Sequence, residues 1–232
     1  MGGKTLVVLG SGPGIGVSTA CAFSVRGFTH IALVSRNAER LKQDWDAVLT
    51  AIQERGYPAQ VKTWVCDLCD LDALRKTLKE IENFGTLECV FYNAARVAGK
   101  PLLEEKVEQV EQDFKTANLA LYETACWAIP LLQKSSSDSS RSPSIIVTST
   151  DQLYKQPIPD LFSLSMTKAA QRNLVQSLHA TYGKEIHIAL LSVGGIVSPE
   201  KKTLSPENIA DEAWALYKQP KSQWQFEVEV VE

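Results

Sequence analysis

Short runs of apolar and β-branched residues alternate with longer stretches of helical periodicity along this chain. Runs that are apolar throughout, such as LVVLG and SIIVTS, suit strands that are covered on both faces. Repeated strand-helix units imply right-handed crossovers within a parallel sheet, so the pattern predicts a doubly wound α/β fold with about seven strands and helices on both faces. The predicted strands lie at 4–10, 30–36, 60–67, 87–94, 144–150, 185–193 and 226–232.

The length of 232 residues and the 44% hydrophobic content allow one large core, so we expect a single domain over 1–232. One segment, KSSSDSSRSP at 134–143, has nothing to bury and is predicted to be a flexible surface loop. It is not expected to be a domain linker, because the alternation continues on either side of it.

Composition excludes several classes of function. The net charge of -3 gives no basic field for nucleic acid or an anionic membrane, so a small-molecule partner is expected. The apolar run at 6–9 is too short for a signal sequence and no later segment approaches a membrane span, which predicts a cytoplasmic protein. Five cysteines with a single C-x-x-C pair (Cys66 and Cys69) indicate reduced, packed thiols and no metal site.

A glycine-rich loop follows the first predicted strand and precedes a helix. Glycines in this position permit a tight turn and bring backbone N–H groups against a pyrophosphate at the helix N-terminus, so the loop predicts nucleotide binding. The predicted contacts are Gly10, Ser11, Gly12, Gly14, Ile15 and Gly16.

The end of the second predicted strand indicates which dinucleotide would bind. It carries Ser35 and Arg36 and lacks the acidic residue that would accept hydrogen bonds from an unphosphorylated adenosine ribose. A guanidinium group at this place would pair with a 2′-phosphate, so NADP(H) is favoured over NAD(H).

The glycine loop, Asp67 after TWVC, YNAA at 92–95, Asn118 in FKTANLALYE, SIIVTST and Lys168 together resemble the short-chain dehydrogenase/reductase family, in order over nearly the whole chain. The resemblance implies a Rossmann-type fold. It also implies that Lys168 holds the nicotinamide ribose and that Asn118 bends its helix and supports a water and the lysine. Further implied cofactor contacts are Asp67, Leu68, Asn93, Ala94, Ala95, Gly195 and Val197.

The sequence departs from the family at Leu164, which stands four residues before Lys168 where the family carries its catalytic tyrosine. In the family, this phenol exchanges the oxygen-bound proton of the substrate during hydride transfer. The tail from 204 to 232 is similar to an atypical branch of the family that also tends to lack the tyrosine. Either Thr150 or Ser149 occupies the position of the family serine, and Val193 replaces a proline of the segment beside the nicotinamide, with Ser198 near its threonine position.

Two residues are candidates to replace the missing phenol, and a third is a candidate for a different chemistry. Tyr154, in the loop 151–160 that borders the predicted pocket, is the best phenolic substitute, and Ser165 is a weaker proton donor near the face of Lys168. Asp151 is a candidate general base for a reaction without hydride transfer. The catalytic candidates are therefore Asn118, Ser149, Thr150, Tyr154 and Lys168.

Three functions remain open at this stage. The first is an NADP(H)-dependent reductase of a preactivated imine, iminium or enone group. A bulky substrate is expected because only a short segment separates Ser198 from the next helix, and the divergent site favours a specialised biosynthetic route. The second is a non-redox cyclase, isomerase or dehydratase, and the third is a catalytically silent NADP(H)-binding protein. The helices at 104–133 and 165–182 resemble the pair that family members bury against a twin subunit, which predicts a homodimer.

Overall fold

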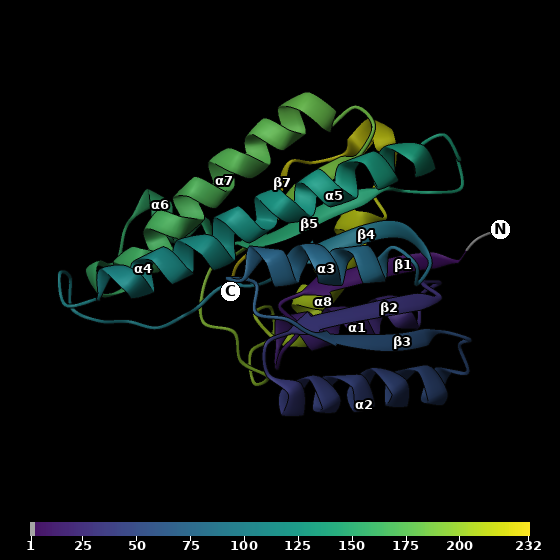
Figure 1. Ribbon diagram of the computed structural model, residues 1–232, viewed down its shortest axis with the longest axis horizontal. Coiled ribbons are helices and arrows are strands. Elements are labelled where there is room, and N and C mark those ends of the chain that lie inside the picture. Colours follow the sequence, from purple (N-terminus) through teal and green to yellow (C-terminus); the bar gives the residue numbers. More distant parts are fainter. Residues whose placement is uncertain (1–2) are drawn as a thin grey trace.

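The computed structural model describes residues 3–232 and contains a seven-stranded sheet in which every pair of neighbours is parallel (Figure 1). The strand order is β3-β2-β1-β4-β5-β6-β7, so the chain leaves β1 toward one edge and later returns to build the other. The predicted fold class is confirmed. The strands are β1 (Lys4–Leu9), β2 (His30–Ser35), β3 (Gln60–Val65), β4 (Thr86–Tyr92), β5 (Ser144–Ser149), β6 (His187–Val193) and β7 (Glu227–Val230).

Helices cover both faces of the sheet (Figure 1). One face carries α1 (Ile15–Ser24), α2 (Ala38–Arg55) and α8 (Pro206–Tyr217), and the other carries α3 (Leu71–Ile81), α5 (Ala120–Ser135) and α7 (Phe162–Tyr182). One π-helical turn, η1 (Lys115–Leu119), joins α4 (Val107–Phe114) to α5. Short elements complete the chain: α6 (Asp151–Lys155), η2 (Pro159–Leu161) and η3 (Lys221–Gln223).

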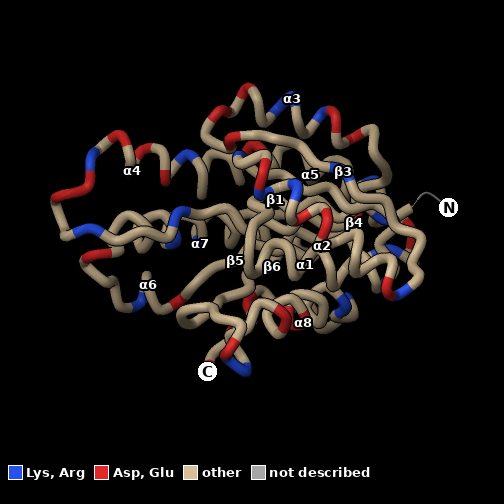
Figure 2. The backbone as a smooth tube through the Cα atoms, turned by 90° about the horizontal axis from the view of Figure 1, so that it is seen from below, with Lys and Arg blue, Asp and Glu red and all other residues tan. Residues whose placement is uncertain are grey.

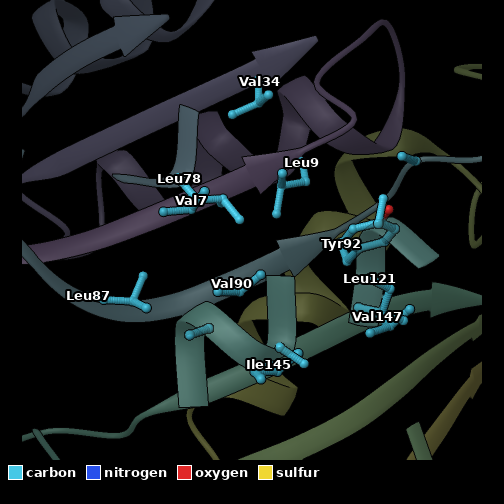
Figure 3. Close-up of a cluster of buried hydrophobic side chains, with 14 of the residues drawn as sticks. Val7, Leu9, Val34, Leu78, Leu87, Val90, Tyr92, Leu121, Ile145 and Val147 are labelled. Atoms are coloured by element: carbon cyan, nitrogen blue, oxygen red, sulfur yellow. The ribbon is translucent and has the colours of Figure 1, made fainter. Parts of the chain in front are cut away.

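Successive residues of β1 enter different cores. Val7 and Leu9 point to the α3/α5/α7 face, where Leu78 and Leu121 pack against the sheet (Figure 3), whereas Val8 joins the α1/α2/α8 face. All of these side chains are buried. Burial on both faces explains why the central strands are apolar throughout, without the alternation of a half-exposed strand.

The segment 134–143 is fastened to the sheet near its end. Glu88, a fully buried carboxylate in β4, accepts hydrogen bonds from Arg141 Nη1 at 3.0 Å and from the backbone N–H of Ser142 at 2.7 Å. Tyr217 of α8 also donates to Glu88, at 3.0 Å. The mobility of this segment stays a prediction, but its Arg141 end is bonded to the core.

The segment 151–160, expected to be a loop, contains α6 and leads into η2. Acidic and basic residues are mixed along α3, whereas the charged residues within α4 are all acidic (Figure 2). Within residues 3–232, no helix is long and apolar enough to cross a bilayer. The same part of the chain contains no group of three or more metal-ligating side chains.

Candidate nucleotide-binding and active site

A cavity of about 430 Å³ opens at the carboxyl ends of the central strands. It lies where the strand order reverses, because β1 has β2 on one side and β4 on the other. Open α/β sheets bind their ligands in the crevice at such a switch point. Among the predicted cofactor contacts, the cavity is lined by Gly10, Ser11, Gly12, Ser35, Arg36, Asp67, Leu68, Asn93, Ala94 and Ala95.

Close packing fixes the glycine loop at its first residue. Gly10 has a φ of 89°, and a Cβ on this residue would lie 2.6 Å from the backbone nitrogen of Ala94, so no larger residue fits there. The loop is tied to β2 by hydrogen bonds from the N–H groups of Gly10 and Ser11 to the carbonyl of Val34, each at 3.0 Å. Ser11 Oγ also donates to Asp44 of α2 at 2.8 Å.

The loop has room for a phosphate group. Nothing lies within 4 Å of a Cβ built on Gly12 or on Gly14, and Gly14 immediately precedes the N-terminus of α1. Open space beside the N-terminal N–H groups of a helix suits an anion. The residues present therefore fit the diphosphate of a dinucleotide. Ile15 and Gly16 begin α1 and do not line the cavity.

Asn93 connects the phosphate loop to the neighbouring strand. Its Nδ2 donates to the carbonyl of Gly10 at 3.1 Å, and its Oδ1 accepts from Thr148 Oγ1 of β5 at 3.0 Å. The side chain thus holds the ends of β1, β4 and β5 together beneath the cavity. The sequence prediction identified Asn93 but not Thr148.

Arg36 is exposed at the rim of the cavity, directly after β2. Its guanidinium makes no ion pair or hydrogen bond with the described residues, whereas most other arginines of the chain are bonded to carboxylates. A cation in this position is available to a phosphate group. Cys66 and Cys69 also line the cavity, and burial raises the pKa of both thiols, which disfavours the reactive thiolate.

Lys168 is fully enclosed in α7. Its Nζ donates to the carbonyl of Thr148 at 2.7 Å and to Oε1 of Gln171 at 2.9 Å. Burial lowers the pKa of Lys168 to about 8, because the charged ammonium loses its hydration. Lys168 does not line the 430 Å³ cavity.

Gln171 is a site residue that the sequence prediction missed. It is fully buried, and its Nε2 donates to the carbonyl of Ala117 in η1 at 2.8 Å while its Oε1 accepts from Lys168. The carboxamide therefore bridges the π-helical turn to the lysine. Its position three residues after Lys168, on the same helix face, was the available signal.

Asn118 lies in the π-helical turn η1. Its Nδ2 donates to the carbonyl of Thr167 at 3.2 Å. Its Oδ1 is buried and has no hydrogen-bond partner among the described residues. Lys168 is contacted by Gln171 and not by Asn118. Both side-chain amides connect η1 to α7, Asn118 through the carbonyl of Thr167 and Gln171 through the carbonyl of Ala117.

The hydroxyl candidates lie at the end of β5. Ser149 is buried, and its Oγ lacks a hydrogen-bond partner within residues 3–232. Thr150 is half-buried and forms the N-cap of α6 without a side-chain cap bond. Leu164 is buried in α7, four residues before Lys168.

Tyr154 is held in a separate network. Its hydroxyl donates to Glu227 of β7 at 3.1 Å and accepts from Arg172 at 2.9 Å, and Arg172 also pairs with Glu227. Burial and the Glu227 carboxylate raise the pKa of Tyr154 to about 12. A phenol in this state is a weaker acid than usual, which disfavours it as a substitute for the missing tyrosine.

The other two candidate proton donors or bases are also engaged. Asp151 is buried and pairs with Lys155 at 2.5 Å, which lowers the pKa of the carboxyl group. Ser165 Oγ donates to the carbonyl of Leu161 at 3.0 Å, within its own helix. Neither side chain lines the described cavity.

Arg96 and Asp113 form a second feature that sequence reasoning missed. Arg96 lines the cavity and bonds to Asp113 at 2.8 and 2.9 Å and to Glu105 at 2.7 Å. Ser163, next to Leu164, donates to Asp113 at 2.7 Å. Burial raises the pKa of Asp113, but the bonds from Arg96 and Ser163 outweigh it, so the pKa is lowered and the carboxylate stays charged. The contact pairs are far apart in sequence and carried no local signal.

The segment after β6 stays outside this cavity. Gly195 is exposed, and Val197 is half-buried against the α1/α2/α8 core. Ser198 donates its hydroxyl to Glu200, and its N–H bonds to the carbonyl of Leu204 at 3.1 Å. Val193, at the proline position, completes β6.

Comparison with known proteins follows this geometry. The family model for short chain dehydrogenase matches residues 4–209. D-arabinitol 2-dehydrogenase [ribulose-forming] of Candida tropicalis is 27% identical over 207 residues, which cover 85% of this chain and 72% of that protein.

Two solved structures share the fold. An alcohol dehydrogenase from the archaeon Thermococcus sibiricus, complexed with 5-hydroxy-NADP, has a TM-score of 0.83 at 24% identity and covers 98% of this chain and 95% of its own. The NADH-dependent reductase A1-R', complexed with NAD, has a TM-score of 0.80 at 16% identity and covers 98% and 95%.

A parallel sheet with a glycine loop and an open crevice at its switch point defines a Rossmann-type, nucleotide-binding class of enzyme. Within that class, the chain belongs to the short-chain dehydrogenase family and is an oxidoreductase-like enzyme.

Proposed function

We propose that the protein is an NADP(H)-dependent reductase that acts on an activated C=O, C=N or C=C group of a bulky substrate. The observation that carries this proposal is the pairing of a complete glycine loop and buried Lys168 with an apolar Leu164. The chain has kept what holds a dinucleotide and has lost the phenol that would assist an ordinary ketone. A substrate that is already cationic or conjugated needs less help from an acid.

The chain's own residues would hold the cofactor in three places. Gly12 and Gly14 would receive the diphosphate, Arg36 the 2′-phosphate, and Lys168 the nicotinamide ribose. The adenosine would lie against Asp67, Leu68 and the segment 93–95. When bound, the reduced nicotinamide supplies the hydride. The guanidinium of Arg36, exposed at the rim of the cavity, supports NADP(H) over NAD(H).

Polarisation of the substrate would fall to the hydroxyl groups after β5. Ser149 Oγ has no hydrogen-bond partner among the described residues, so it is available to donate to a substrate oxygen or nitrogen. Thr150, half-buried at the start of α6, is the alternative donor. A hydrogen bond from a neutral hydroxyl group stabilises the charge that develops on the substrate oxygen less than full proton transfer does. This weaker assistance is consistent with a preactivated substrate.

The reaction is tested with purified protein, NADPH and a panel of ketone, iminium and enone substrates. Absorbance of the reduced nicotinamide and product mass are followed together. We expect NADPH oxidation with little turnover of ketones. An enone product should gain two hydrogens, one as hydride and one as a proton, and an iminium cation should gain one hydride to give the neutral amine. An isomeric or dehydrated product with unchanged NADPH would assign a non-redox reaction. NADPH binding without any turnover would leave the protein a cofactor-binding partner.

We also propose a homodimer that uses the outer faces of α5 and α7. Leu119 in η1, Tyr122 of α5 and Met166 of α7 are large apolar side chains that remain exposed on these elements. Sedimentation of the wild type against Tyr122→Glu tests the proposal: the wild type should sediment as a dimer, and the variant should shift toward the monomer. A monomeric wild type at micromolar concentration contradicts it.

A further inference from the structure

A second cavity, of about 490 Å³, lies at the amino ends of the central strands, whereas the nucleotide-binding cavity lies at their carboxyl ends. It is bordered by the beginnings of β1 and β4, the ends of α3 and α5, and the segment 136–141. The two cavities share no lining residue. Its volume falls within the range of small-molecule sites, which is about 300 to 1,000 Å³.

Two buried polar atoms at this cavity lack a partner. Thr5 Oγ1 of β1 and Trp127 Nε1 of α5 make no hydrogen bond with the described residues, although both residues line the cavity. Buried side-chain polar atoms are satisfied in the large majority of cases, so two such atoms beside one cavity call for an explanation. An indole N–H can only donate, so its partner must be an acceptor.

The remaining lining defines the rest of the occupant. Ile81, Leu87 and Leu131 contribute apolar surface beside the indole ring of Trp127. Leu131 and Lys134 follow Trp127 at i+4 and i+7, so all three lie on one face of α5. This face differs from the one that carries Tyr122, since 122 and 127 are separated by about 140° around the helix.

One cation at the cavity is available to an anion. The ammonium of Lys134 has no ion pair with the described residues. The two lining carboxylates each have a cationic partner, Glu82 with Lys79 at 3.0 Å and Asp138 with Arg141 at 3.6 Å. An acceptor for Trp127, an apolar body and an anionic group for Lys134 together describe one chemical class.

We infer that this cavity is a second ligand site, remote from the cofactor, for a small carboxylic acid with a flat apolar body. The carboxylate would pair with Lys134 and accept from the indole N–H of Trp127, and the apolar body would lie against Leu87 and Leu131. No covalent step is involved. The inference does not depend on the reductase function, because it concerns residues that the catalytic end does not use.

The test follows the indole N–H resonance of Trp127 in full-length protein labelled with ¹⁵N, assigned by its loss in Trp127→Phe. The probes are 3-phenylpropanoate and its neutral counterpart 3-phenylpropan-1-ol. We expect the acid to shift this resonance in a saturable manner. Lys134→Gln should lower the affinity for the acid about fivefold without changing the affinity for the alcohol. Lys42→Gln, an exposed lysine on α2 at the opposite face, is the matched control and should have no effect.

Saturating NADPH should leave the affinity for the acid unchanged, since the cavities are separate. The inference is overturned if neither probe shifts the Trp127 resonance, or if Lys134→Gln binds the acid as tightly as the wild type. Competition between the acid and NADPH would also overturn it, because the acid would then occupy the nucleotide cavity. Lys134 is exposed, so its replacement is not expected to affect folding.

Discussion

The ammonium group of Lys168 lies 2.9 Å from the side-chain oxygen of Gln171, and the amide of the same glutamine donates to the carbonyl of Ala117 in the π-helical turn. A neutral amide that cannot titrate thus holds the buried lysine on one side, and the carbonyl of Thr148 holds it on another. Leu164, four residues before Lys168 on the same helix, has no group that can exchange a proton.

Lys168 should make stability depend on pH in the alkaline range. Its pKa is about 8 in the folded protein, against 10.5 for an unperturbed lysine, so the unfolded chain binds more protons between these pH values and the free energy of unfolding rises with pH. Between pH 8 and 10.5, the free energy of unfolding of the wild type should rise by about 3 kcal/mol relative to that of Lys168→Met. Urea unfolding of both proteins at several pH values measures this gain. Parallel profiles would contradict a depressed lysine pKa.

Replacement of Gln171 by leucine should destabilise the protein by about 2 kcal/mol, because the buried carbonyl of Ala117 and the ammonium of Lys168 each lose a partner. The loss of an acceptor for the charged form should also lower the pKa of Lys168 further, so the alkaline rise in stability begins at lower pH. Gln176→Leu, exposed on the same helix, is the control. Equal unfolding midpoints for the two variants would show that the bridge contributes nothing.

Arg36→Gln should lower the affinity for NADPH about 10- to 100-fold and change the affinity for NADH little, because only NADPH brings a 2′-phosphate to the guanidinium. Titration calorimetry with both cofactors measures the two affinities. Arg55→Gln, at the far end of α2 and also exposed, should leave both unchanged. A similar loss for NADPH and NADH would mean that Arg36 contacts a group common to the two cofactors.

Leu164→Tyr should raise the rate of ketone reduction at least about tenfold, because it returns a phenol to the helix face that carries Lys168. The rate is followed by NADPH absorbance with a ketone that the wild type reduces slowly. Leu164→Phe controls for the added ring without the hydroxyl. No difference between the two variants would indicate that Arg96, Asp113 and Ser163 have reshaped the pocket beyond the loss of one side chain.

Glu88→Gln should lower the free energy of unfolding by about 3 kcal/mol, since a fully buried carboxylate bonds to Lys4, Arg141 and Tyr217. Urea unfolding at pH 7 measures the effect, and exposed Glu39→Gln on α2 is the control. Proteolysis of the segment 134–143 should also accelerate in Glu88→Gln alone. If cleavage were equally fast in the wild type, the contacts of Arg141 and Ser142 would not restrain this segment.

Much of the architecture followed from local patterns. Strands apolar throughout, glycines after the first strand, and helical periods between the strands predicted the parallel sheet and the place of the nucleotide crevice. Arg36 was predicted from its position after β2, and Leu164 was singled out by the family resemblance, which places a tyrosine four residues before the lysine. These inferences work because backbone geometry and burial on both faces act over a few consecutive residues.

Tertiary structure decided the contacts between distant segments. Tyr154, the best phenolic substitute by its position in the sequence, donates a hydrogen bond to Glu227 of β7, seventy-three residues away. Gln171 reaches Ala117, Arg96 reaches Asp113, and Glu88 receives Arg141 from a segment that looked unattached. The second cavity likewise exists only where α3, α5 and two strand ends meet. Sequence periodicity indicates which side of a helix or strand is buried. Which residue lies across the interface depends on how the elements pack, so the hydrogen bonds and ion pairs between distant segments are decided by the tertiary structure.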